Sequence, residues 1–289
     1  MASLKEVKGR IASVNNTRKI ASAMKMVASA KLHKAQAAIE NMLPYERRLN
    51  HILTNFLSAG DRVESPFTER REVKRVAIVV FASNTSLCGG FNANVIRQLT
   101  AVLDRYRFLG MDNIMLYPIG RKVAEGVKKM GLKAEGDFQR MADKPSYHEA
   151  ATLASELMRR FLHHDVDKVE LLYNHFRSTV VQVMTHETYL PIEWTREKEA
   201  GESDRTTDYI VEPSVDMLLE ELLPKVLCLK MFTVLLDSNA AEHAARTMAM
   251  QIATDNANDL LQELTVMYNK SRQQAITSEL LDIVGGSMA

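Results

Sequence analysis

The segment that most suggests chemistry is Ser83-Asn-Thr-Ser-Leu-Cys-Gly-Gly-Phe-Asn92, which follows an apolar, β-branched run and precedes a helical pattern. In α/β proteins, a loop at this place often binds phosphate through N–H groups at the helix N-terminus. The segment matches neither Gly-x-x-x-x-Gly-Lys-Ser/Thr nor Gly-x-Gly-x-x-Gly, and it lacks a lysine for a terminal phosphate. We therefore favour a structural turn and keep a ligand loop as the alternative.

Cys88 and the group His163-His164-Asp165 are further candidates for a nucleophile and for metal ligands. A nucleophilic cysteine needs a neighbouring His or helix terminus that lowers the thiol pKa, and the sequence indicates neither, which favours a buried structural residue. The two histidines and the aspartate have no second ligand pair at suitable spacing, so a solvated helix end is the better interpretation.

Other titratable residues are isolated in the sequence. His175 and His186 alternate with apolar residues on expected strands and have no evident partner. Glu220 and Glu221 are adjacent on an expected helix, where they point in different directions and make a poor acid–base pair. With no Ser-His-Asp signature either, we predict no catalytic, cofactor or metal site in this chain.

Composition narrows the classes of function. The 289 residues carry 37 Lys and Arg against 36 Asp and Glu, which disfavours a strongly basic nucleic-acid binder. Two distant cysteines indicate a reducing compartment. The longest clean apolar run, residues 76–82, is far shorter than the roughly 20 residues of a membrane-spanning helix. We expect no signal peptide, no direct membrane insertion, and at most a peripheral membrane location reached through partners.

Both ends of the chain read as very long helices. Apolar and small residues alternate in steps of three and four from about Leu4 to about Ser58, and again from about Val215 to about Val284. The second helix would be roughly 100 Å long, which exceeds any compact domain of this size. Gly285 and Gly286 are expected to end it.

The two helices are predicted to pair antiparallel as a coiled coil. Each would bury the apolar stripe of the other, and their charges are opposite. Residues 1–40 contain eight basic and two acidic residues, a net charge of +6, whereas residues 237–264 contain five acidic residues and Arg246, a net charge of −4. The alternative is that the stripes are ordinary core faces and the charges are solvated.

The middle of the chain alternates strand and helix patterns, which predicts a small, doubly wound, Rossmann-like α/β domain between the helices. We expect strands over 74–81, 113–119, 168–176 and 179–188, and helices over 92–107, 121–130 and 146–164. The predicted organisation is a coiled-coil helix at 1–60, an α/β domain at 72–195, a charged linker or foot segment at 196–212, and a coiled-coil helix at 213–289.

Three segments resemble the gamma subunits of F-type ATP synthases. The first is Ile11-Ala-Ser-Val-Asn-Asn-Thr-Arg-Lys-Ile20, with the stretches 23–28 and 31–35 that follow it. The second is the central Cys88-Gly-Gly-Phe-Asn92. The third comprises Ala244-Ala-Arg-Thr-Met-Ala-Met250, Ala253-Thr-Asp-Asn-Ala257 and the run Asn269-Lys-Ser-Arg-Gln-Gln-Ala-Ile-Thr-Ser-Glu-Leu280. They span both ends and the middle in the family's order.

This resemblance implies a non-catalytic rotor stalk without a cofactor. The stalk would couple proton transport through a membrane c-ring to ATP synthesis in a head of alpha and beta subunits, with an epsilon subunit as a further partner. The lack of a transit peptide favours a bacterial form on the cytoplasmic face of the inner membrane. A generic coiled-coil scaffold or adaptor, and an α/β nucleotide-binding enzyme using the Ser83–Asn92 loop, remain the alternatives.

The resemblance also implies roles for single residues. Contacts with the catalytic subunits fall on Arg272, Gln273 and Thr277, whose side chains suit charge-assisted and adjustable hydrogen bonds. A fraying polar helix end is the alternative for them. The collar facing the stator falls on Met24 and Lys25, although seam packing also fits Met24. The foot on the membrane ring falls on Tyr209 and Glu212, together with Lys31 and Lys34.

Departures from the family pattern occur at three positions. Asn84 and Ser86 stand where the family usually has Asp and Gly, which puts the turn geometry there in doubt. Thr247 stands where the family often has Met, so we expect a thinner seam at that point.

Overall fold

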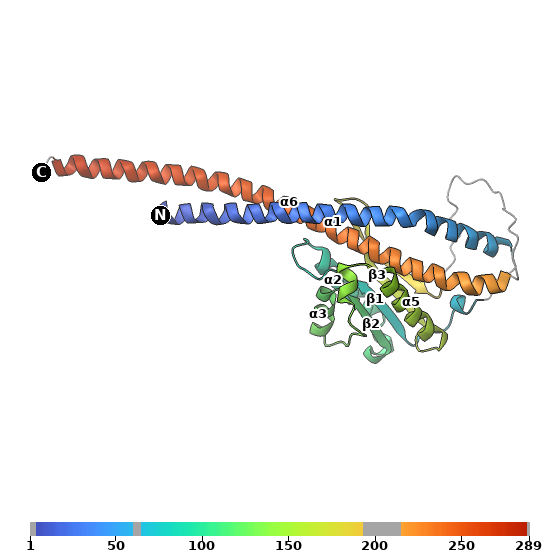
Figure 1. Ribbon diagram of the computed structural model, residues 1–289. Coiled ribbons are helices and arrows are strands. Elements are labelled where there is room, and N and C mark those ends of the chain that lie inside the picture. The colour runs from blue at the N-terminus through green and yellow to red at the C-terminus, as the bar shows by residue number, and fades with distance from the viewer. Residues whose placement is uncertain (1–3, 60–64, 193–214, 288–289) are drawn as a thin grey trace.

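The computed structural model describes residues 4–59, 65–192 and 215–287. Its longest elements are the terminal helices α1 (Leu4–Ala59) and α6 (Val215–Ser287), which lie side by side and run in opposite directions (Figure 1). The predicted antiparallel pair of long helices is therefore confirmed. The predicted end of α6 at Gly285 and Gly286 is wrong, because the helix continues through both to Ser287.

The seam of α1 repeats every seven residues, which is the coiled-coil period. Its buried positions include Val7, Ala21, Ala28, Ala35 and Leu49, and the distal part of α6 buries Met250, Ala257 and Leu264 at the same interval. Alanine at successive seam positions leaves little side chain between the two backbones, so the helices approach closely there.

Hydrogen bonds across this seam join cations to amides. Arg18 Nη1 donates to Asn258 Oδ1 at 3.2 Å, and Lys25 Nζ donates to Gln251 Oε1. Because each bond joins one residue of α1 to one residue of α6, the two bonds help to fix the register of the pair.

A four-stranded sheet lies beside the helix pair. The strands are β1 (Val76–Phe81), β2 (Ile114–Ile119), β3 (Lys168–Phe176) and β4 (Gln182–Leu190), in the order β2-β1-β3-β4. The first three are parallel, and β4 is antiparallel to β3. The domain is thus a mixed α/β sheet. Its hairpin turn is longer than expected, since the N–H groups of Arg177 and Ser178 both donate to the carbonyl of Val181 and β4 begins only after it.

Helices cover both faces of the sheet. The shorter elements are α2 (Phe91–Arg105), α3 (Arg121–Lys129), α4 (Gln139–Asp143), α5 (Tyr147–Leu162), and the 3₁₀ turns Pro66–Thr68, Arg107–Leu109 and Met111–Asn113. The helices α2 and α3 pack on one face, and α5 and α6 pack on the other. Every residue of β1 is buried, as expected for a central parallel strand covered on both sides.

This arrangement explains the apolar stretch of α6 near its start. From Leu223 to Leu236 the helix lies between α1 and the sheet, so it is apolar on most of its circumference. Beyond the sheet it keeps only the narrow seam toward α1. None of the described helices is long and apolar enough to cross a membrane.

Candidate functional site

The distal end of α6 projects beyond the start of α1 (Figure 1). Leu4 lies 14 residues before Arg18, and Arg272 lies 14 residues after Asn258, the hydrogen-bond partner of Arg18. In an antiparallel pair, α1 therefore begins opposite Arg272, and the 15 residues from there to Ser287 extend about 23 Å past it.

This projecting end carries the predicted contact residues, and all three are exposed. Arg272, Gln273 and Thr277 lie on one helix, and Thr277 Oγ1 donates to the carbonyl of Gln273 at 2.9 Å. Large apolar side chains accompany them, namely Ile276, Leu280, Leu281, Ile283 and Val284, which are 49–67% exposed. Such a concentration of exposed apolar side chains is typical of a surface that binds another protein.

The predicted collar residues lie on α1 beside the seam. Met24 is half-buried, which agrees with seam packing as one of its roles. Lys25 binds Gln251, whose Nε2 in turn donates to both carboxylate oxygens of Asp255 at 2.8 Å. Ile20, Met26 and Val27 are 58–65% exposed on the same part of α1, so this region also presents apolar surface.

The predicted foot residues are separated. Tyr209 and Glu212 fall in 193–214 and therefore lie outside the described residues. Lys31 and Lys34 are exposed in the middle of α1, 25 or more residues before its end at Ala59. Their assignment to a foot stays a prediction.

A buried polar cluster lies where α6 passes the edge of the sheet domain. It consists of Glu242, His243, Arg246 and Thr247, each 8–9% exposed. Arg246 Nη2 donates to Glu242 Oε1 at 2.6 Å, and Arg246 Nη1 donates to the carbonyl of Ser86. Thr247 Oγ1 donates to the carbonyl of His243 at 2.8 Å, which satisfies its hydroxyl within the helix.

Burial governs the charges of this cluster. Desolvation raises the pKa of Glu242, although its hydrogen bond from Arg246 opposes the change. Desolvation, and then the positive charges of Lys31 and Arg246, lowers the pKa of His243 to about 4. His243 is thus neutral at neutral pH, and the pair of Glu242 and Arg246 holds the loop at Ser86 against α6.

The loop 83–92 is a turn held by hydrogen bonds between its own residues. Ser83 N–H donates to Asn92 Oδ1 at 3.1 Å, Ser83 Oγ donates to the carbonyl of Thr85 at 2.7 Å, and Asn92 Nδ2 lies 3.2 Å from Cys88 Sγ. The side chains of Ser83, Cys88 and Asn92 are therefore committed to contacts within the loop. Cys88 is 2% exposed, in agreement with a buried structural residue.

Asn84 stabilises this turn from outside. Its Oδ1 accepts from the N–H of Arg121 at 2.8 Å, and its Nδ2 donates to the carbonyl of Gln139 at 2.7 Å. A carboxylate could not make the second bond, so an asparagine suits the turn of this chain in place of the aspartate usual in the resembled family.

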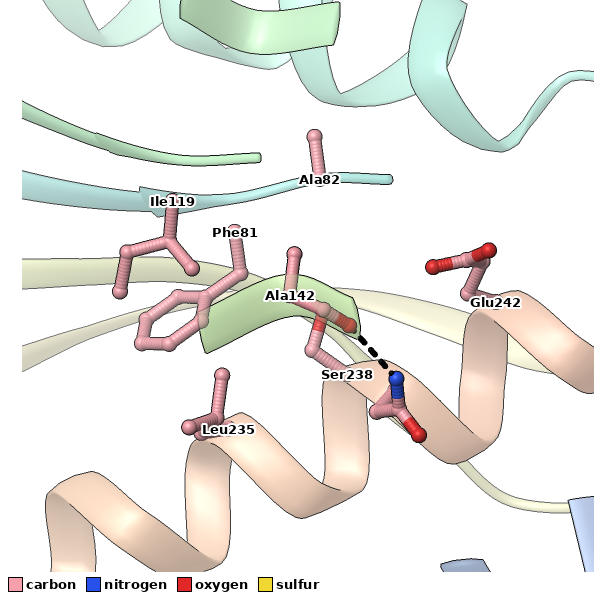
Figure 2. Close-up of a pocket in the computed structure, with 8 residues that line it drawn as sticks. Phe81, Ala82, Ile119, Ala142, Leu235, Ser238 and Glu242 are labelled. Carbon is pink, nitrogen blue, oxygen red and sulfur yellow. Dashed lines mark hydrogen bonds between the residues drawn. The ribbon is translucent and has the colours of Figure 1, made fainter. Parts of the chain in front are cut away.

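Two cavities adjoin α6, and neither resembles a nucleotide site. Figure 2 shows the smaller one, about 10 Å³, which has room for about one water molecule. It is lined by Phe81, Ala82, Ile119, Ala142, Leu235, Ser238, Asn239 and Glu242. A second hollow of about 200 Å³ lies between the Cys88–Phe91 turn and α6, and it has no charged side chain in its lining. No group of three or more potential metal ligands occurs among the described residues.

Sequence reasoning missed the partners of both strand histidines. His175 Nδ1 lies 2.6 Å from Asp237 Oδ2, and His186 Nε2 lies 2.7 Å from Glu170 Oε2. The expectation that these histidines lack partners is therefore wrong. The partners are 62 and 16 positions away, so only the position of Glu170 within an apolar strand could have suggested one of them.

Comparisons with known proteins agree with this geometry. The family profile described as "ATP synthase" matches residues 3–289. The ATP synthase gamma chain of Phocaeicola vulgatus is 83% identical over the full length of both chains, and that of Bacteroides fragilis is 63% identical over the full length of both. The gamma chain of Cytophaga hutchinsonii is 41% identical and covers 100% of this chain and 99% of its own length.

Solved structures share the fold. A chain of the Tetrahymena thermophila mitochondrial ATP synthase, in a structure of its central stalk and c-ring, has a TM-score of 0.56 at 21% identity and covers 81% of this chain and 99% of its own. A chain of the Euglena gracilis mitochondrial ATP synthase has a TM-score of 0.63 at 17% identity, covering 99% and 93%. With these relatives beside its long helix pair and mixed sheet, the chain belongs to the family of ATP synthase gamma chains, the non-catalytic central-stalk subunits of F-type ATP synthase.

Proposed function

We propose that this chain transmits rotation between a membrane c-ring and the catalytic head of alpha and beta subunits. The observation that carries the proposal is the bare end of α6, which projects past α1 and exposes apolar side chains. A single helix of this kind fits a narrow axial hole in a ring of subunits. The paired part of α1 and α6 supplies stiffness, since the two helices pack against each other along the seam.

The proposal assigns each region a partner. Arg272, Gln273 and Thr277 contact the catalytic subunits, and Met24 with Lys25 faces the collar of the stator. The α/β domain stands on the c-ring beside an epsilon subunit, together with the C-terminal end of α1 and the N-terminal end of α6. The foot on this ring contains Tyr209 and Glu212, and the resemblance assigns Lys31 and Lys34 to it as well. The complex lies on the cytoplasmic face of a bacterial inner membrane, where ion flow drives the ring.

Purification of the native complex tests the proposal directly. We expect this chain to copurify with alpha, beta, epsilon and c subunits in fixed proportions. A probe attached to the α/β domain should rotate when ATP is supplied. Isolation of the chain with a different set of partners would favour a generic coiled-coil scaffold, and nucleotide binding by the isolated chain would favour the enzyme alternative.

Replacement of Arg272 by Ala tests the proposed head contact. A hydrogen bond to a charged group contributes enough energy for its loss to lower ATP hydrolysis and synthesis about tenfold, while assembly is retained. The measurements are both activities in membranes that contain equal amounts of assembled complex. Lys270→Ala is the matched control, because Lys270 is an exposed cation of α6 two positions away and thus on another face of the helix. Normal activity of the Arg272→Ala complex would count against the assignment.

A further inference from the structure

The end of β3 is the point where the α/β domain meets both long helices. Phe176, the last residue of β3, packs against an apolar cluster that Leu32 and Ala35 of α1 form with Ala240 and Ala244 of α6. It also packs against a second cluster, formed by Cys88, Phe91 and Ala241. This one residue therefore joins the sheet, the loop and the helix pair.

A carboxylate of α6 accepts a hydrogen bond from the backbone at this junction. Asp237 Oδ1 accepts the N–H of Phe176 at 2.8 Å, and Oδ2 lies 2.6 Å from Nδ1 of the preceding residue, His175. The side chain of Asp237 is 15% exposed, whereas that of His175 is 52% exposed. Hydrogen bonds to a carboxylate are shorter and stronger than those between neutral groups.

The rest of the interface between α6 and the domain is mostly apolar. Leu223, Leu227, Met231, Val234 and Leu235 pack against the sheet and α5. Apolar contact opposes separation, but the hydrophobic effect is non-directional. Hydrogen bonds with defined geometry add a directional restraint on the rotational position of the domain on the helix.

Asp237 differs from the other residues that form directional bonds between α6 and the domain, one of which is Arg246 with its bond to the carbonyl of Ser86. Tyr189 Oη donates to the carbonyl of Leu227, Lys230 pairs with Glu187 of the edge strand β4, and Asn239 binds the carbonyl of Ala142 in the short helix α4. Asp237 uses both oxygens and holds β3, an interior strand of the sheet. A displacement of the domain around α6 would break both bonds together.

We propose that Asp237 is a positioning residue that fixes the rotational register of the α/β domain on the shaft, so that torque passes between them without slip. This inference rests on the proposed rotor function. It requires that removal of the carboxylate softens the joint between domain and shaft while the contacts of α6 with the head remain unchanged.

The test uses the assembled ATP synthase with a rotation probe on Arg107→Cys, an exposed position of the domain. Torsional stiffness is obtained from the angular fluctuations of the probe during pauses. For Asp237→Ala we expect wider fluctuations, with displaced orientations populated about tenfold more, and normal unloaded ATP hydrolysis. Asp237→Asn keeps an acceptor for Phe176 N–H and should restore most of the stiffness, and Asp104→Ala, which removes an exposed carboxylate of α2, should change nothing.

Three outcomes separate the possibilities. Rotation of the Asp237→Ala complex with the stiffness of the Asp104→Ala control would overturn this inference and leave the rotor function intact. Absence of rotation in the unsubstituted complex would overturn the rotor function and the inference with it. Should Asp237→Ala fail to assemble, His175→Ala provides the same measurement. It removes one of the two bonds and should soften the joint to a smaller degree, and unchanged stiffness would refute the inference.

Discussion

Gly120→Ala is expected to lower the free energy of unfolding by about 4 kcal/mol or more, because two independent penalties coincide at this glycine. Its φ of +105° is a conformation that residues with a Cβ rarely adopt. A Cβ atom there would also lie 2.2 Å from the carbonyl oxygen of Ala82. The three nearest atoms, two of Ala82 and one of Ser83, all belong to the backbone, so no side chain can move aside.

The surrounding hydrogen bonds prevent the backbone from relaxing. Ala82 N–H donates to the carbonyl of Ile119 at 2.8 Å, and Lys122 N–H donates to the carbonyl of Ser83 at 3.0 Å. Gly120 therefore lies where the loops after β1 and β2 cross. Displacement of either loop would break the turn that contacts Arg246.

Urea denaturation of the full chain measures the effect, with Gly131→Ala as the matched control. Gly131 also has a positive φ, +74°, but nothing lies within 4 Å of its added Cβ. The control should lose only about 1–2 kcal/mol, the cost of the left-handed conformation. Equal losses in the two variants would show that the contact with Ala82 contributes nothing.

Glu170→Ala is expected to destabilise the protein by about 3–5 kcal/mol, because it removes the buried acceptor shared by three half-buried donors. The Glu170 side chain is 3% exposed. Its oxygens lie 2.6 Å from Tyr106 Oη, 2.7 Å from Lys168 Nζ and 2.7 Å from His186 Nε2. The variant would leave a lysine and a histidine without their carboxylate.

The exposed pair of Lys74 and Glu72 supplies the control. Its atoms are 3.8 Å apart, and both side chains are at least 75% exposed. Glu72→Ala should therefore change stability by less than about 1 kcal/mol. A similar loss in both variants would contradict the role of burial at Glu170.

Acid titration tests the same carboxylate. Although desolvation alone would raise it, the pKa of Glu170 is lowered to about 2 by its hydrogen bonds from His186, Lys168 and Tyr106. A carboxyl whose folded-state pKa lies below its unfolded value stabilises the fold above the unfolded pKa, near 4.5, and loses this contribution as the pH falls toward 2. The contribution is about 3 kcal/mol, and Glu170→Gln should abolish that part of the acid dependence. Identical acid unfolding of the Glu170→Gln variant and the unsubstituted protein would contradict this contribution of Glu170.

The amino-acid sequence by itself determined the long helices, their pairing and the identity of the family. Seam positions from Val7 to Leu49 repeat at a local period, so the sequence carries this signal without any knowledge of distant contacts. The apolar run of β1 likewise indicated a strand covered on both faces. The turn at 83–92 could be predicted because it lacks the lysine and the glycine spacing of phosphate loops.

Only the tertiary structure decided the contacts that join these elements. The sequence shows Asp237 only as an acidic residue of a long helix, and His175 only as an isolated strand histidine. The two side chains form a pair because the end of β3 packs against α6. Gly120 becomes irreplaceable only because the loop after β1 crosses it. The physical reason is that periodicity reports which face of an element is buried, whereas the partner of a polar side chain depends on the packing of segments far apart in the chain.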